Sequence, residues 1–436
     1  TGKYTHEGTG TAKLYLMAGG KAQDSTTLET DSTYNFRLRY TPKHTGNFAY
    51  ALVAGATEQK DTLGQLPVQV LPPQELGILL LTSAPSFEFK FLKNHLAELQ
   101  HKVALRTTIS KNISRSEWLN MPQTDLSRIT EKLLRQFDAV VTEPEALQAL
   151  SLSERNALQR VVTETGLGVL TIAAAPVTGK STSFFTGFQT KRVTGQEVRS
   201  TRASWADNAA PIASAAPYAL VRTNALSTLV AEQESNLLAG ARQAGWGKVA
   251  FSLVPQTFPW QLEGKQEVYA SYWANLLTQV AREEVQEKFW QLKEPQVPQP
   301  GKPVILHYTD YTLADGAVPP VATVVSLTDT AGIKLPLAQQ VHQPERFSGT
   351  FWPRRSGWHQ VQLQGGEPYL FYVQDTSDFR FEGIAGKLAA TQAFAAKQRI
   401  TPSETPVAYR EEPVPVVWFF LLFVLSSAYL WLEEKL

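Results

Sequence analysis

The stretch Leu76-Gly77-Ile78-Leu79-Leu80-Leu81 contains no polar or charged side chain. A continuous apolar run, ended by the break Ser83-Ala84-Pro85-Ser86, is typical of a strand that is buried on both faces of a parallel sheet. The next residues place Phe89, Leu92 and Leu96 on one face of a helix. A buried strand followed by an amphipathic helix predicts an α/β domain.

The alternation of strand and helix continues to about residue 284. Ser151 and Glu154 have the spacing of a capping box that opens a helix, and Gly166 is positioned to end it. Further strands are expected at 103–108, 138–141 and 167–172, and further helices at 126–135 and 268–282. We therefore predict a flavodoxin-like, doubly wound parallel sheet over residues 76–290.

Residues 1–75 and 303–376, on either side of this domain, alternate apolar and polar residues in short runs. They share a local repeat, in which Pro42-Lys-His-Thr-Gly46 matches Pro353-Arg-Arg-Ser-Gly357. Such a connection is a turn, because proline fixes φ and glycine takes the positive φ. Each segment is predicted to be an immunoglobulin-like β-sandwich, which gives a multidomain chain of the α/β plus all-β class.

The C-terminal part is predicted to hold a Pro-rich linker at 291–302, a helix and juxtamembrane spacer at 377–413, and a transmembrane helix at 414–432. The last segment has no ionisable side chain and would reach about 28 Å as a helix. These features predict a single-pass membrane protein, and the β-rich architecture favours a bulk that lies outside the cytoplasm. A buried core helix is the alternative.

Within that segment, the small residues Ser426-Ser427-Ala428 offer a face on which a partner helix could pack. We expect this face to contact other membrane proteins, with the lipid bilayer around the rest of the helix. The chain begins at Thr1 and not at a methionine, so its start is expected to be processed or incomplete.

Composition excludes several classes of function. The 41 basic and 40 acidic residues give a formal charge of +1, so the chain lacks the excess of positive charge that would attract nucleic acid. Cysteine is absent, which excludes disulfides, thiolate metal sites and a cysteine nucleophile. No cofactor and no metal site is predicted.

Two stretches of the predicted α/β domain carry a resemblance. The segment 79–93, LLLTSAPSFEFKFLK, resembles the opening of the class I glutamine amidotransferase-like domains of large bacterial membrane proteins. The segment 244–251, followed by Phe258-Pro-Trp260 and by Tyr272-Trp273, is similar to their closing strand and final helix. The resemblance implies flanking β-sandwiches, a transmembrane helix, and partners among MoxR-type ATPases and von Willebrand factor A-domain membrane proteins. It also implies a location in the bacterial cell membrane, with the bulk of the chain periplasmic.

Amidotransferase chemistry needs a thiolate after the central strand and a histidine base that an acidic residue orients. The strand at 167–172 best matches that position, but Ala173-Ala174-Ala175-Pro176 follows it. The only histidines of the domain, His95 and His101, lie on or just after its first helix. The domain is therefore predicted to be degenerate, and the protein not to be an enzyme.

Gly179-Lys180-Ser181 offers an alternative, since it ends a relaxed P-loop pattern after a strand. A phosphate loop must feed a helix whose N-terminus binds the anion, whereas the residues that follow here have strand and loop character. An exposed turn is the simpler interpretation, and a nucleotide-binding or hydrolytic protein remains the alternative.

Other signals are weaker. His307, Asp310 and Asp315 match no metal-site spacing and are interpreted as solvated strand ends. The five tryptophans at 246, 260, 273, 352 and 358 are interpreted as packing residues, with glycan binding by those that are exposed as an alternative. The sequence thus predicts a non-catalytic cell-envelope scaffold or interaction protein, a membrane-anchored subunit of a larger assembly; a cell-wall glycan-binding module is the further alternative.

Overall fold

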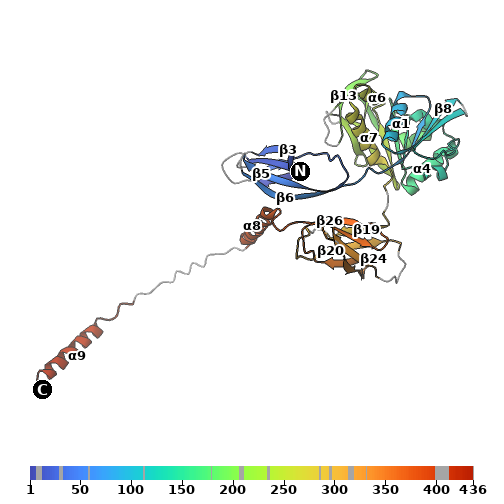
Figure 1. The fold of residues 1–436 in the computed structure, drawn as a ribbon. Helices are drawn as coiled ribbons and strands as arrows, with labels where there is room; N and C mark the ends of the chain where they lie inside the picture. The colour runs from blue at the N-terminus through green and yellow to red at the C-terminus, as the bar shows by residue number, and fades with distance from the viewer. Residues whose placement is uncertain are drawn as a thin grey trace.

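The computed structural model contains an N-terminal β module, an α/β domain, a C-terminal β module and a helical tail (Figure 1). It describes residues 1–5, 12–28, 33–56, 59–110, 113–177, 179–205, 211–232, 236–283, 286–293, 297–312, 319–329, 331–397 and 412–435. The predicted spacer before residue 412, the candidate Asp315, and Asn112 of the tripeptide Asn112-Ile113-Ser114, which has the pattern of a glycosylation site, lie outside these ranges.

The N-terminal β module consists of a four-stranded antiparallel sheet in the order β3-β2-β5-β6 and a two-stranded sheet of β1 and β4. Gly46 opens β5 with a φ of 142°, which is the backbone conformation that the Pro42–Gly46 turn predicts. The bounds are β1 (Gly2–Thr5), β2 (Ala12–Ala18), β3 (Lys21–Leu28), β4 (Thr33–Phe36), β5 (Gly46–Ala56) and β6 (Gln59–Val70).

The α/β domain is built on one mixed twelve-stranded sheet. Its parallel part has the order β8-β7-β10-β11-β18, so the chain order reverses between β7 and β10. The strands of this part and its antiparallel edge strand are β7 (Gly77–Thr82), β8 (Lys102–Ser110), β9 (Ile113–Leu119), β10 (Ala139–Thr142), β11 (Gly168–Ile172) and β18 (Gly247–Ser252).

Helices cover both faces of the parallel strands (Figure 1). In β7, Ile78 and Leu80 pack with α1 and α7, whereas Leu79 and Leu81 pack with α2, α3 and α4 on the other face. The capping box of Ser151 is confirmed at the start of α4. The helices are α1 (Phe87–Glu98), α2 (Glu131–Leu134), α3 (Pro144–Ala149), α4 (Leu152–Thr165), η1 (Lys180–Thr182), α5 (Ser183–Thr186), α6 (Phe258–Leu262) and α7 (Gln266–Val280).

The remaining strands extend the sheet in antiparallel fashion beyond β18, so the expected purely parallel sheet is wrong. A buried ion pair between Arg199 and Glu232 joins β13 to β16, and Arg199 Nε also donates to the Ala216 carbonyl at 2.9 Å. The extension comprises β12 (Thr190–Arg192), β13 (Arg199–Ser204), β14 (Ile212–Ala215), β15 (Tyr218–Leu220), β16 (Ser227–Glu232) and β17 (Leu237–Ala244).

The C-terminal β module has two four-stranded antiparallel sheets, β19-β20-β24-β23 and β22-β21-β25-β26. Because β19 pairs with β20, the module includes residues upstream of the expected linker. Gly357 opens β25 with a φ of 109°, as Gly46 opens β5. The bounds are β19 (Lys288–Leu292), β20 (Val304–Asp310), β21 (Val321–Ser326), β22 (Ile333–Pro336), β23 (Ala338–Gln340), β24 (Gln343–Phe351), β25 (Gly357–Leu363) and β26 (Tyr369–Val373).

The tail contains α8 (Arg380–Lys397) and α9 (Val417–Glu433). Among the described residues, no helix combines the length and the apolarity that crossing a membrane requires. Pro415 lies outside α9, whose 17 residues reach about 26 Å against a hydrocarbon core of about 30 Å. The predicted transmembrane helix at 414–432, and with it the single-pass membrane localisation with a periplasmic bulk, is therefore wrong.

Candidate functional site

Ligands of open α/β sheets bind outside the carboxyl ends of the strands, where the strand order reverses. Here that point lies between β7 and β10, so Ser83 and Glu143, which directly follow these strands, mark the candidate site. The carboxyl edge also receives the ends of β11 and β18, followed by Ala173 and Leu253. The chemistry available to the domain depends on what these positions present.

Glu143 is hydrogen-bonded across the crevice between β7 and β10. Its Oε1 accepts hydrogen bonds from the Ser83 amide at 2.5 Å, from Thr82 Oγ1 at 3.0 Å and from the Ser83 hydroxyl. All three donors meet the same oxygen, so they tie the Glu143 carboxylate to the end of β7 through Oε1. A hollow of about 10 Å³, the room that a single water needs, lies beside Thr82. Its lining residues are Leu81, Thr82, Arg106, Thr108, Ala146, Ala149 and Leu150.

The position of the expected nucleophile carries a methyl group. Ala173 follows β11, is buried, and donates its amide to the Ser252 carbonyl at 2.9 Å. Neither histidine reaches this edge, because α1 runs away from it and ends beside the opposite edge. There His101 Nδ1 accepts the Leu76 amide at 3.1 Å, and His95 packs edge-on against Tyr269. Burial lowers the pKa of both histidines.

Gly179, Lys180 and Ser181 form a short turn beside α3. Lys180 and Ser181 are exposed, and the Lys180 carbonyl accepts the Ser183 hydroxyl at 2.9 Å. The helix that follows, α5, has only four residues. A phosphate loop relies on the dipole and free amides of a longer helix, so this turn lacks the element that would hold the anion.

Glu88 is a buried carboxylate that the sequence did not reveal. It lies in the first turn of α1 and accepts the amides of Thr257 at 2.7 Å and Phe258 at 3.0 Å, as well as the Thr257 hydroxyl. Burial raises the pKa of Glu88, and these hydrogen bonds oppose the rise. Trp273 Nε1 donates to Thr257 Oγ1 at 3.0 Å, which completes a cluster that fixes α1 to α6 and α7.

Three phenylalanines lie at the same edge, of which Phe87 is exposed and Phe91 and Phe258 are partly exposed. Phe87 and Phe91, from the start of α1, each lie 5.8 Å from Phe258, measured between ring centroids. Phe87 is 65% exposed although it is a large apolar side chain. We call Phe87, Phe91 and Phe258 the phenylalanine patch. The carboxyl edge therefore presents an apolar surface beside the crevice that Glu143 spans.

The candidates in the C-terminal module have ordinary partners. His307 Nδ1 contacts Gln340 Nε2 at 3.2 Å, and Asp310 accepts the amide and the hydroxyl of Thr312 and lies 3.3 Å from Lys288 Nζ. Within the described ranges, no group of three potential metal ligands comes together.

Among the tryptophans singled out above, Trp260 and Trp273 are buried, whereas Trp246 and Trp352 are exposed. In α9, Ser426 Oγ donates back to the Leu422 and Phe423 carbonyls at 2.9 Å, so its hydroxyl is satisfied within its own helix. Ser427 and Ala428 lie beside it on the exposed surface of α9.

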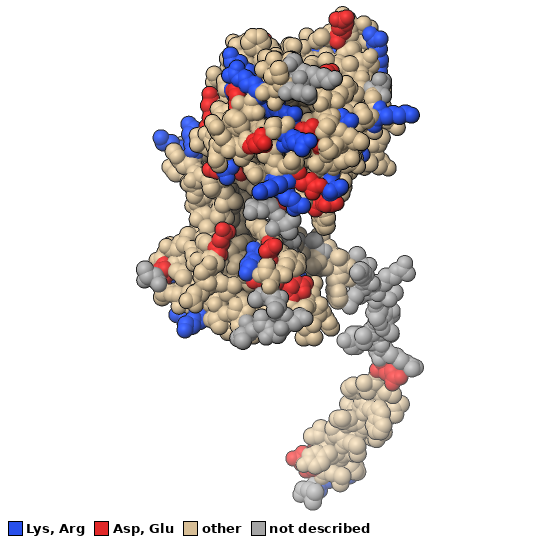
Figure 2. All heavy atoms as spheres, turned by 90° about the vertical axis from the view of Figure 1, so that its right-hand side faces the viewer, with Lys and Arg blue, Asp and Glu red and all other residues tan. Residues whose placement is uncertain are grey.

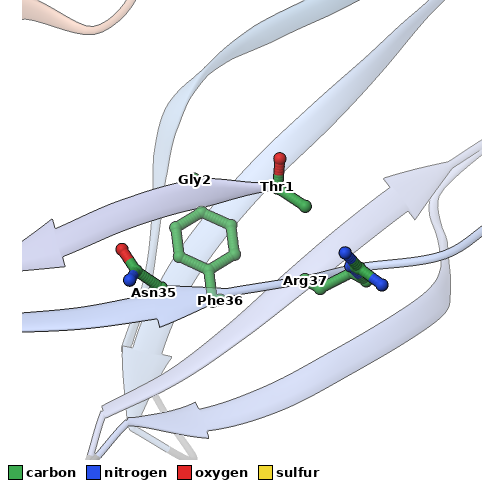
Figure 3. Close-up of a pocket in the computed structure, with 5 residues that line it drawn as sticks. All are labelled: Thr1, Gly2, Asn35, Phe36 and Arg37. Atoms are coloured by element: carbon green, nitrogen blue, oxygen red, sulfur yellow. The ribbon is translucent and has the colours of Figure 1, made fainter. Parts of the chain in front are cut away.

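A larger hollow, of about 430 Å³, lies in the N-terminal module and is lined by Thr1, Gly2, Asn35, Phe36 and Arg37 (Figure 3). The Phe36 ring lies under β1, where a Cβ on Gly2 would come within 2.5 Å of it. These side chains offer one apolar ring and one cation but no acid and base pair, so the hollow does not support catalysis.

Charge does not single out a site either. On the face that Figure 2 shows, lysine and arginine side chains are interspersed with aspartate and glutamate. That mixture agrees with the near balance of the whole chain, and on this face it gives no continuous basic surface for a polyanion.

No protein-family model and no curated protein matches the chain. One structurally similar chain is the exo-beta-1,4-mannosidase Op5Man5 from Opitutaceae bacterium strain TAV5, with 13% sequence identity and a TM-score of 0.30. The similarity covers 48% of this chain and 37% of the mannosidase, so the chain matches little more than a third of that protein's length. A similarity this low bears on neither the fold nor the function.

Proposed function

We propose that this chain is a non-catalytic interaction protein, in which a degenerate class I amidotransferase-like domain and two β modules form a scaffold for protein partners. The observation that carries the proposal is the carboxyl edge of the parallel strands. Glu143 Oε1 accepts hydrogen bonds from Thr82 and Ser83, and Ala173 stands where a nucleophile would be required.

The phenylalanine patch supplies the contact surface in this proposal. Exposed aromatic side chains are enriched at protein interfaces, because they bury much apolar area with few rotatable bonds. The patch rests on a rigid base, since Glu88 fixes the start of α1 to the segment that carries Phe258. The resemblance suggests MoxR-type ATPases and von Willebrand factor A-domain proteins as the first partners to test.

The experiment combines an activity assay with partner binding. We expect no glutamine hydrolysis by the full chain, and binding of one of these purified partners that is weakened at least tenfold by Phe87→Ser with Phe258→Ser. Leu152→Ser is the matched control, because Leu152 is equally exposed on α4 but lies outside the patch. Glutamine turnover by the wild-type chain, or partner binding that the double variant leaves intact, would refute the proposal.

The two alternatives stay predictions with their own tests. Nucleotide binding at Gly179-Lys180-Ser181 requires that ATP or GTP binds the full chain and that Lys180→Ala abolishes the binding. Glycan binding requires that the chain binds cell-wall polymers through exposed aromatics such as Trp352, which is 57% exposed, and that Trp352→Ala reduces the bound fraction.

A further inference from the structure

The segment after the C-terminal module contacts the N-terminal module, although the chain joins these modules only through the α/β domain. Phe379 follows β26 and precedes α8, and its amide donates to the Leu63 carbonyl of β6 at 2.7 Å. Because β6 is an edge strand, its outer carbonyls are free to accept such a hydrogen bond. In Figure 1, α8 accordingly starts beside β6.

The Phe379 ring packs against the backbone at Gly64, where a larger residue would place its side chain. It packs with the core of the N-terminal module, and a Cβ built on Gly64 would lie 2.6 Å from the ring. Gly64 itself is buried, and its φ is not positive, so the strand backbone does not require glycine there. Glycine is required at position 64 because the aromatic ring approaches the strand so closely.

Phe379 also has a strained backbone, with a φ of 48°. A bulky side chain in the left-handed region is a strained outlier that persists only where its surroundings hold it. Two contacts hold the Phe379 backbone in this conformation: the hydrogen bond to the Leu63 carbonyl and the packing of the ring against Gly64.

The other end of the segment is fixed to the C-terminal module. The Gln374 amide donates to the Pro298 carbonyl at 2.8 Å, and the Asp375 carboxylate accepts the Ser377 amide at 2.9 Å. The Asp378 carboxylate in turn accepts the Asp375 amide at 3.1 Å. The turn is therefore ordered by its own hydrogen bonds and presents the next residue, Phe379, to β6.

We infer that Asp375–Phe379 is an intramolecular clasp, in which the Phe379 ring packs against Gly64. The clasp joins the C-terminal module to the N-terminal module, and it thereby holds the two β modules in one fixed placement. This inference is independent of the proposed function. The strain at Phe379 makes the clasp releasable, since opening it relieves the backbone while it exposes the edge of β6.

The test measures the distance between the modules in the full chain. Because the chain has no cysteine, Lys21→Cys and Lys334→Cys introduce two unique labelling sites at exposed positions of the two modules. Pulsed electron paramagnetic resonance of the spin-labelled protein is expected to give one narrow distance distribution. Phe379→Ala should broaden it and shift it to longer distances, because the ring leaves its seat.

Gly64→Val is the second variant, because its side chain would fill the space that the Phe379 ring occupies. It leaves the sequence of the clasp unchanged, and valine is favourable in a strand. Phe394→Ala is the matched control, because Phe394 is 61% exposed on α8. A broad distribution in the wild-type chain, or a narrow one that both Phe379→Ala and Gly64→Val retain, would overturn the clasp. A distance peak that vanishes on dilution with unlabelled protein would overturn it too, because the contact would then join two copies.

Discussion

The two β modules share a turn but differ in how their cores are completed. Gly46 and Gly357 open equivalent strands with a positive φ, each four residues after a proline. The C-terminal module then buries a continuous cluster that includes Val304, Phe347 and Val361 within its own sheets. In the described part of the N-terminal module, the corresponding cluster is three leucines, and Phe379 from beyond the C-terminal module packs against it.

The difference shows that a local repeat specifies a turn without specifying a core. Proline and glycine act through the backbone of a few residues, whereas a core needs side chains from every surrounding strand. The C-terminal module obtains them from its own sequence, and the N-terminal module obtains one from the clasp. Its stability should therefore depend on a distant segment, and that of the C-terminal module should not.

The largest effect is expected for Phe347→Ala. This ring is fully buried in the C-terminal module, and its removal should cost about 3–5 kcal/mol of unfolding free energy. Hydrogen exchange of the amides in β20, β24 and β25 as urea is added reports on this module. The N-terminal module should keep its hydrogen-exchange protection, and a parallel loss there would contradict the independence of the two cores.

A smaller effect is expected for Gly64→Val, about 1–3 kcal/mol, because the added side chain collides with the Phe379 ring. The loss should be confined to the N-terminal module. Combining it with Phe379→Ala should remove most of this cost, since the colliding ring is gone, and a fully additive double variant would show that the two residues are not in contact.

The shared turn offers an internal comparison. Gly46→Ala and Gly357→Ala should each cost about 1–2 kcal/mol, because both place a Cβ at positive φ. Gly366→Ala, at a glycine without a positive φ and without a close neighbour, is the control. Differential scanning calorimetry of the full chain measures all three, and clearly unequal costs at 46 and 357 would show that the turns are not equivalent.

The smallest effect concerns pH. Burial acts to raise the pKa of Asp310, but the Thr312 hydrogen bonds and Lys288 lower it below its usual value of 3.8. The ionised Asp310 carboxylate therefore contributes to the free energy of unfolding above the pKa that the group has in the unfolded chain. This contribution is lost as the pH falls through the pKa of the folded state. For Asp378 in the clasp, burial raises the pKa, so its contribution is present at low pH and is lost as pH rises.

Acidification below about pH 4 should thus weaken the C-terminal module before it weakens the clasp. Asp310→Asn should remove that part of the pH dependence in urea unfolding of the C-terminal module. A pH profile that the substitution leaves unchanged would assign the acid sensitivity to another group.

Local signals in the sequence predicted local structure well. The apolar run at 78–81 is a strand buried on both faces, Ser151 and Glu154 cap α4, and both turn glycines have positive φ. The extension of the sheet was missed, because most of its strands are short and rich in threonine, arginine and alanine.

The contacts that matter most join residues far apart in the chain, and no periodicity reveals them. Glu88 meets Thr257, and Phe379 meets Gly64. The error at the C-terminus arose because a count of apolar residues ignores where the helix begins, which here is after Pro415. At the candidate site, Ala173 was visible in the sequence, but the hydrogen bonds that Glu143 accepts from Thr82 and Ser83 were not.

Hydrogen exchange of the full-length Phe379→Ala variant tests the contrast between the two modules most directly. We predict faster exchange of the amides in β2, β5 and β6, unchanged protection in β20, β21 and β25, and no change at either place in Phe394→Ala. Unchanged protection of β6, or an equal loss of protection in both modules, would contradict the dependence of the N-terminal core on the clasp.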